Sequence, residues 1–122
     1  NTNDLKYQSM SLGERKIFDF LNNKNIKFIS EKTFPDCRDK ALLRFDFYLI
    51  DYNCIIEFDG IQHDLETDYF RSSLVENQFK DNIKNEYCLN NKIQMLRIKY
   101  IELIQQTLET TIVKFLDNIK NN

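Results

Sequence analysis

The segment RFDFYLIDYNCIIEFDG, at 44–60, constrains the fold of this chain more than any other. Two runs of aromatic and β-branched residues flank a short Asp-Tyr-Asn segment, and Gly60 ends the second run. This pattern is typical of two strands joined by a tight turn. The sequence therefore predicts a β-hairpin at this position.

Helices and further strands are expected on both sides of the hairpin. Ser11 followed by Glu14 fits a capping box, which predicts a helix that runs to about Asn23. The spacing of apolar residues predicts a strand over 26–34, a helix over 69–91, a strand over 93–100 and a helix over 101–119. The expected order is α-β-β-β-α-β-α, which makes an α/β fold.

The composition narrows the class of protein. The 122 residues fit a single domain, 1–122, and the absence of an initial Met is consistent with excision from a larger protein. No apolar run approaches the roughly 20 residues needed to cross a bilayer, so we expect no membrane partner. Three widely spaced cysteines without a CxxC motif fit a reducing compartment, and we expect an intracellular, cytoplasmic protein.

Charge is distributed unevenly along the chain. The net charge of −2 argues against a simple nucleic-acid coat, yet 71–100 holds six Lys or Arg against three Asp or Glu. No Lys or Arg occurs between Arg44 and Arg71, a gap that contains His63, the only histidine. The gap also contains seven acids: Asp46, Asp51, Glu57, Asp59, Asp64, Glu66 and Asp68. The sequence thus predicts an acidic pocket followed by a basic helix.

The turn of the hairpin decides which acids meet. A two-residue turn at 51–52 places Asp46 opposite Glu57, and the same turn one residue later places it opposite Asp59. A three-residue turn would instead pair Asp46 with Phe58. On either two-residue register the three acids line one face of the hairpin, because directly opposed residues share a face.

Opposed carboxylates favour a metal site. Two of them about 4 Å apart repel by roughly 4 kcal/mol at an effective dielectric near 20, a cost that a divalent cation between them would remove. Oxygen ligands suit Mg²⁺ or Mn²⁺ better than Zn²⁺. Glu14 lies three and four residues before Ile17 and Phe18, so it shares the inward side of its helix and could reach the same cavity.

Each of these residues also has an ordinary structural interpretation. Glu14 completes a capping box, an isolated strand acid such as Asp46 or Glu57 is more often solvated, and His63 alone is more often a loop or core residue. Lysines on a helix usually form a solvated face. The combination of converging acids, a Gln-His pair and a basic helix is what favours a functional site.

With these residues in view, the chain resembles a family of small phage, viral and bacterial nuclease domains. That family is related to the very-short-patch-repair (Vsr-like) endonucleases and the EDxHD homing endonucleases of the PD-(D/E)xK superfamily. The similarity covers 9 to about 102 and is most specific in FDFYL…IEFDGxQH. The S-x-G-E opening and the D-x-x-K-N-x-Y-C helix agree with it. The resemblance implies a restriction-endonuclease-like core, a four-stranded mixed sheet flanked by helices.

The resemblance also implies roles for individual residues. The catalytic residues would be Glu14, Asp46, Glu57 and His63. The metal ligands would be Asp46, Glu57 and Asp59, with Mg²⁺ as the cofactor and Mn²⁺ as a substitute. The nucleic-acid-binding residues would be Arg71, Lys80 and Lys84.

The sequence departs from the family pattern in three places, one of which is the acidic run after His63, where many relatives have a Gly-rich loop. Asp59 occupies the lysine place of the (D/E)xK element, and Arg44 stands where a proline is expected. The candidates to replace the lysine are Gln62, His63, Asp64 and Lys84. His63 is preferred among them, because Vsr-like enzymes rely on a histidine after the hairpin.

The implied activity is Mg²⁺-dependent hydrolysis of DNA phosphodiester bonds, by nicking or double-strand cleavage, in the host cytoplasm for a phage or viral protein. A homodimer or other domains of a parent protein would supply the base-reading surface that one small chain lacks. The missing lysine and the acidic balance favour an alternative, an inactive nuclease-like domain that binds nucleic acid or a partner protein. A structural protein with a calcium-binding hairpin is a weaker alternative, because no D-x-[DN]-x-[DN]-G loop is present.

Overall fold

The computed structural model describes residues 2–60 and 68–121. Its helices are α1 (Thr2–Ser9), α2 (Leu12–Asn23), α3 (Asp68–Asn90), α4 (Tyr100–Ile104) and α5 (Leu108–Lys120). Its strands are β1 (Phe28–Lys32), β2 (Phe45–Leu49), β3 (Cys54–Asp59) and β4 (Gln94–Lys99).

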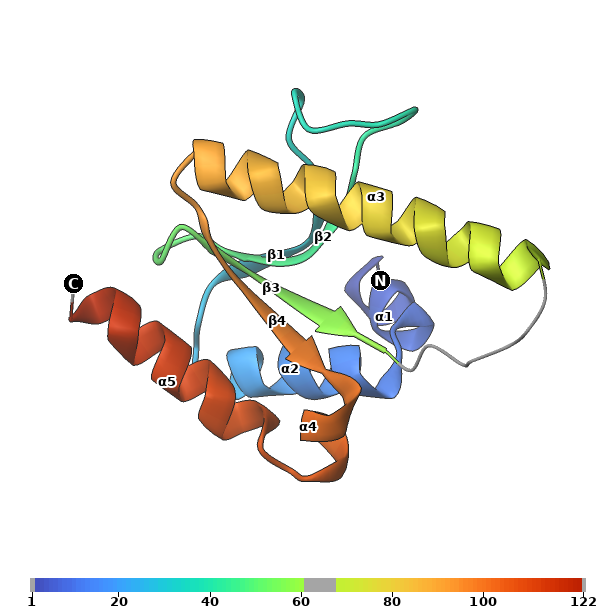
Figure 1. The fold of residues 1–122 in the computed structure, drawn as a ribbon. Helices are drawn as coiled ribbons and strands as arrows, with labels where there is room; N and C mark the ends of the chain where they lie inside the picture. Colours follow the sequence, from blue (N-terminus) through green and yellow to red (C-terminus); the bar gives the residue numbers. More distant parts are fainter. Residues whose placement is uncertain (1, 61–67, 122) are drawn as a thin grey trace.

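The four strands form one mixed sheet in the order β1-β2-β3-β4 (Figure 1). The first three strands are antiparallel neighbours, whereas β4 runs parallel to β3. A parallel pair needs a long crossover, and α3 supplies it between β3 and β4. The expected α/β fold with a four-stranded mixed sheet and flanking helices is confirmed.

Helices cover both faces of this sheet (Figure 1). On one face, Ile17 of α2 and Ile112 of α5 are fully buried in a cluster that includes Phe47 and Ile56. On the other face, α3 contributes Cys88 to a second cluster, whose buried members also include Cys37, Leu43, Phe45, Ile55 and Ile93. The sheet is therefore the central layer, with a hydrophobic cluster on each face.

Two elements differ from those expected. The helix expected over 101–119 is divided into α4 and α5, because Gln106 adopts a left-handed φ of 59° that interrupts the helical path. The short helix α1 was not expected, since it lacks a clear apolar stripe. It is held by α2: Tyr7 Oη donates to Asp19 Oδ2 at 3.0 Å, and the guanidinium of Arg15 donates to two carbonyls at the end of α1.

Within the described ranges, none of the helices combines the length and apolar character needed to cross a bilayer. Cys37, Cys54 and Cys88 are buried free thiols.

Candidate active site

The hairpin turn places Asp46 opposite Glu57. The paired residues are Phe47 with Ile56, Tyr48 with Ile55 and Leu49 with Cys54, and Asp46 and Glu57 are the next residues of the two strands beyond this ladder. Residues 50–53 form the turn: the Asn53 N–H contacts the Ile50 carbonyl at 3.4 Å, and Asn53 adopts a φ of 49°. Of the three registers considered from the sequence, the structure has the one with a turn centred on 51–52.

At this pair, side-chain carboxylates accept the hydrogen bonds of backbone N–H groups on the neighbouring strand. Glu57 Oε2 accepts a hydrogen bond from the Asp46 N–H at 2.6 Å. Asp46 Oδ2 in turn accepts from the Phe58 N–H at 2.8 Å. Each acid is thus tied to the backbone of the neighbouring strand, and the two carboxyl groups are brought side by side.

The pleat of β2 is interrupted at the same point. Phe45 and Phe47 are two residues apart and would share a face of a regular strand. Instead, Phe45 belongs to the cluster under α3 and Phe47 to the cluster on the α2 and α5 side. Across the strand pair, Glu31 of β1 adopts a φ of 53°. The local twist places Asp46 at the edge between the two cores.

Lys84 of α3 reaches the same carboxylates. Its Nζ forms an ion pair with Glu57 Oε1, and both side chains are nearly buried, at 11% exposure for Lys84 and 4% for Glu57. The ammonium also lies 4.9 Å from the centre of the Phe45 ring, a cation–π contact. Both oxygens of Glu57 therefore have partners, the Asp46 N–H on one and Lys84 on the other.

Asp46 has a strongly perturbed pKa. Burial and the negative charges of Glu57 and Glu14 together raise its pKa from 3.8 to about 7, although the Phe58 N–H and the charge of Lys84 act in the opposite direction. A carboxyl in such surroundings is expensive to ionise, because its charge has lost water and faces other acids. Perturbed carboxyl groups of this kind gather at functional sites.

Glu14 approaches this pair from α2. The expected capping box is present, with the Ser11 N–H bound to Glu14 Oε1 at 3.0 Å and the Glu14 N–H bound to Ser11 Oγ at 3.3 Å. Gly13 allows α2 to lie close to β3, since a Cβ at this position would come within 2.1 Å of the Phe58 ring. Glu14 therefore both caps its helix and places a negative charge near Asp46.

Asp59 has a different set of partners. Its Oδ2 accepts a hydrogen bond from Lys99 Nζ at 2.7 Å, and its Oδ1 lies 3.5 Å from Arg97. Two cations of β4 thus already neutralise this acid. Among the described residues, no group of three or more His, Cys, Asp or Glu side chains is arranged to hold a metal ion.

Asp46 and Glu57 nevertheless suit Mg²⁺. This ion keeps several waters and is usually held by one or two carboxylates together with substrate phosphates, so it does not require a full protein cage. Two hard oxygen donors lie side by side here, and Asp46 must lose its proton before it can bind such an ion. Asp46 and Glu57 are therefore the residues that could hold the Mg²⁺ expected from the sequence.

Arg97 is a residue that the sequence reasoning missed. It contacts Asp59 of β3 and Asp81 of α3, both at 3.5 Å, and donates to Asn85 at 2.8 Å. It therefore fastens α3, and with it Lys84, to the sheet. A signal for it was present: R-x-K in β4 lies in register with E-x-D in β3, which pairs opposite charges across parallel strands.

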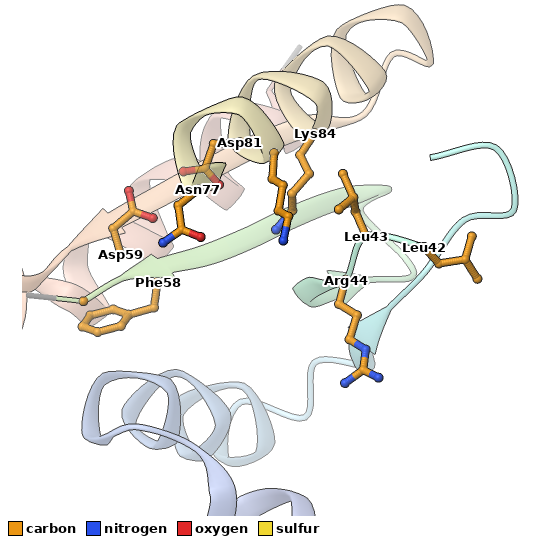
Figure 2. Close-up of a pocket in the computed structure, with 10 residues that line it drawn as sticks. Leu42, Leu43, Arg44, Phe58, Asp59, Asn77, Asp81 and Lys84 are labelled. Atoms are coloured by element: carbon orange, nitrogen blue, oxygen red, sulfur yellow. The ribbon is translucent and has the colours of Figure 1, made fainter. Parts of the chain in front are cut away.

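A cleft of about 470 Å³ opens beside the acids. Its walls are the 42–44 segment before β2, the end of β3 and the facing side of α3 (Figure 2). Figure 2 shows Lys84 extending from α3 toward the strands, with Arg44 on the facing segment. Because Lys84 lines the cleft and pairs with Glu57, the cleft leads to the carboxylates.

The remaining residues singled out from the sequence are placed as follows. Lys80 is exposed on α3 and lines the cleft. Arg71 belongs to α3, but its side chain is outside the described part of the structure. Gln62, His63 and Asp64 lie outside the described residues. The structure thus brings together Glu14, Asp46, Glu57 and Lys84.

The comparisons with known proteins address the fold. The sequence matches no family model, and no curated protein is significantly similar to it. Among solved structures, it is similar to one described as the catalytic domain of the homing endonuclease I-Bth0305I. The TM-score is 0.64 at 19% sequence identity, with coverage of 90% of this chain and 98% of that one. The two chains share a fold. The mixed sheet and flanking helices found here are thus a fold that the catalytic domain of that homing endonuclease also has.

Proposed function

We propose that this chain is a metal-dependent endonuclease that hydrolyses phosphodiester bonds of DNA, a Vsr-like member of the PD-(D/E)xK superfamily. One observation carries the proposal: Asp46 and Glu57 are joined across the hairpin, and Lys84, which pairs with Glu57, lines a cleft. These residues lie in a fold shared with a homing endonuclease catalytic domain.

The acid pair is the proposed Mg²⁺ site, with Mn²⁺ as a substitute. Asp46 and Glu57 would hold the ion, and Glu14 would add negative charge from α2. A bound ion of this kind lowers the pKa of water and stabilises charge on the scissile phosphate. The role of Asp59 is secondary in this proposal, because Arg97 and Lys99 already bind its oxygens.

Lys84 is the proposed replacement for the missing lysine. The (D/E)xK element carries Asp59 in place of lysine, but α3 delivers an ammonium group to Glu57 from another direction. In that position it can orient Glu57 and offer positive charge to a phosphate in the cleft.

His63, which the resemblance favoured for the place of the missing lysine, would instead act as a general base or donate to the phosphate or the leaving oxygen. An unperturbed imidazole with a pKa near 6.5 can take or give a proton at neutral pH. His63 and Lys84 thus have separate tasks, one in proton transfer and one in charge neutralisation.

Cleavage of supercoiled, linear and single-stranded DNA in Mg²⁺, Mn²⁺ or EDTA tests the proposal. We expect hydrolysis that needs the divalent ion and that Glu57→Gln abolishes. Asp51→Asn, which alters an exposed acid in the turn, is the matched control and should cleave normally. Binding of DNA without cleavage in any metal would contradict the proposal and support an inactive nuclease-like domain.

His63→Ala and Lys84→Ala, both measured at saturating Mn²⁺, test the two roles. His63→Ala should reduce the cleavage rate at least about 10²-fold, the usual contribution of positioned acid–base catalysis, and leave the metal-induced stabilisation intact. Lys84→Ala should also lose rate if the ammonium neutralises charge in the reaction. Cleavage at the wild-type rate by either variant would show that the substituted residue has no part in the mechanism.

A further inference from the structure

The cleft beside the acid pair has an uneven balance of charge. Its lining includes three cations, Arg44, Lys80 and Lys84, and two acids, Asp59 and Asp81. Both acids are engaged by cations of β4, since Arg97 contacts each of them and Lys99 also binds Asp59. Lys84 is itself paired with Glu57.

Arg44 and Lys80 are the two cations of the cleft that are left after these pairings. Arg44 is 71% exposed, and its only ion-pair contact among the described residues is with Glu31 at 3.8 Å, a long and solvent-screened interaction. Lys80 is exposed, and no acid of the described part lies within ion-pair distance of it. The two residues come from opposite walls, one from the segment before β2 and the other from α3.

An apolar surface continues from the same cleft. A neighbouring cavity of about 410 Å³ shares Leu42, Leu43 and Lys80 with it and is also lined by Val75 and Phe79. Leu42, Val75 and Phe79 are 41%, 69% and 56% exposed. A small anion would use only the cations, whereas a polymer with both phosphates and apolar sugar and base surfaces would use both regions.

We propose that Arg44 and Lys80 hold one DNA strand between them by its backbone phosphate, from the two walls of the cleft. The inference rests on the proposed nuclease function, and it adds Arg44, which the sequence reasoning treated only as a substitute for proline. The guanidinium can bind a phosphate through two parallel hydrogen bonds, and the ammonium acts as a point charge. Lys84 lines the same cleft and pairs with Glu57, so a phosphodiester held there would lie beside the lysine that contacts the acid pair.

Binding of a short fluorescein-labelled DNA duplex, followed by anisotropy, tests this inference. EDTA is present throughout, so the DNA stays intact and binding is separated from cleavage. Arg44→Ala and Lys80→Ala should each weaken binding by about 5–10-fold in about 0.1 M salt and make the log–log salt slope shallower by about one, because each removes one phosphate contact. Lys114→Ala removes an exposed lysine of α5, on the opposite side of the sheet, and should bind as the wild type does.

Both tested side chains are exposed, so their removal should leave thermal unfolding unchanged, which a melting curve verifies. Equal binding by wild type, Arg44→Ala and Lys80→Ala would overturn the inference even if the protein cleaves DNA. A loss of binding in these two variants without cleavage by the wild type would support the phosphate site and contradict the nuclease. Tighter binding of the matching RNA duplex would overturn the assignment to DNA.

Discussion

Lys84 has an unusual position for a lysine. Its ammonium group is nearly buried against Glu57 and the ring of Phe45. Burying two charges costs several kcal/mol each in lost hydration, and their attraction compensates for this cost only while both are present. In a domain without bound metal, the positive charge of Lys84 therefore lowers the cost of placing the Asp46 and Glu57 carboxylates together.

Lys84→Met should destabilise the protein in EDTA by about 3 kcal/mol or more, because the Glu57 carboxylate would be left buried without its partner. Methionine keeps most of the apolar stem of lysine, so the decrease in stability is caused mainly by removal of the positive charge. Urea unfolding at pH 7.5 measures the effect. Mn²⁺ should raise the free energy of unfolding of Lys84→Met by more than it raises that of the wild type, since the ion replaces the missing positive charge.

The double variant Glu57→Gln/Lys84→Met is the control for this prediction. It removes both charges and should be more stable in EDTA than Lys84→Met alone. Equal urea midpoints for wild type and Lys84→Met would show that the ion pair does not contribute to folding.

The raised pKa of Asp46 makes a prediction about pH. With a pKa of about 7 in the folded protein and 3.8 as the ordinary value, the folded state binds the proton more tightly than the unfolded chain does. Stability should therefore fall as the pH rises from about 4 to about 7. Asp46→Asn lacks this loss, and above pH 7 it should be more stable than the wild type in EDTA by about 2–4 kcal/mol.

Urea unfolding in EDTA at several pH values between about 4 and 8 measures this difference. The stability gap between Asp46→Asn and wild type should close toward pH 4, where the wild-type carboxyl is protonated as well. Asp51→Asn changes an exposed acid in the same hairpin and should follow the wild type. A gap that does not change with pH would mean that Asp46 ionises normally.

At the level of elements, the hairpin was predictable because its information is local. Aromatic and β-branched runs specify the strands, and the capping box of Ser11 and Glu14 specifies the start of α2. The last helix is split at a single residue, Gln106, which has a left-handed φ. Glutamine is not a residue type that predicts this conformation. Helix α1 depends on contacts with Asp19 and Arg15, which no local pattern reveals.

The partner of Glu57 could not be chosen from the sequence for a related reason. Lys84 was one of four candidates to replace the lysine, and His63 was preferred over it. Selecting it requires knowing that α3 crosses over β3 with this side toward the sheet. Arg97 fixes that orientation through Asp81 and Asn85, and these contacts are between elements distant in sequence.

The contact between α2 and β3 gives a prediction at this scale. Alanine is favoured over glycine inside a helix by about 1 kcal/mol, so Gly13→Ala would stabilise an isolated α2. In the protein its Cβ would fall 2.1 Å from Phe58 Cζ, so the ring or the helix must move. We expect a net destabilisation of about 1–3 kcal/mol in urea unfolding.

Phe58→Leu provides the test of this cause. On a Phe58→Leu background the added Cβ has more room, so Gly13→Ala should cost much less than it does beside phenylalanine. Lys16→Ala, at an exposed position of the same helix, should change stability by no more than about 0.5 kcal/mol. Stabilisation by Gly13→Ala in the wild type would show that the packing adapts without cost.

At the level of the whole molecule, the candidate site joins the two sides of the fold. Glu14 comes from α2 on one face, Lys84 from α3 on the other, and Asp46 and Glu57 from the hairpin between them. Each helix belongs to a separate hydrophobic cluster. A ligand bound at the acids therefore acts on the packing of both layers, so its binding should stabilise the domain as one unit.

The melting temperature in Mn²⁺ and in EDTA measures this coupling. A cation bound only by the folded protein stabilises it by RT ln(1 + [L]/Kd), or about 2.7 kcal/mol at a hundredfold excess over Kd. For a domain of this size that corresponds to a rise of roughly 10 °C or more, in a single transition.

Asp46→Asn should melt at or above the wild-type temperature in EDTA and lose the response to Mn²⁺, since it removes both the repulsion and a ligand. Asp51→Asn, with the same change of charge at the exposed turn, should keep the full response. An undiminished Mn²⁺ response in Asp46→Asn would place the ion elsewhere, because the rise would then come from a site that does not use the hairpin acids.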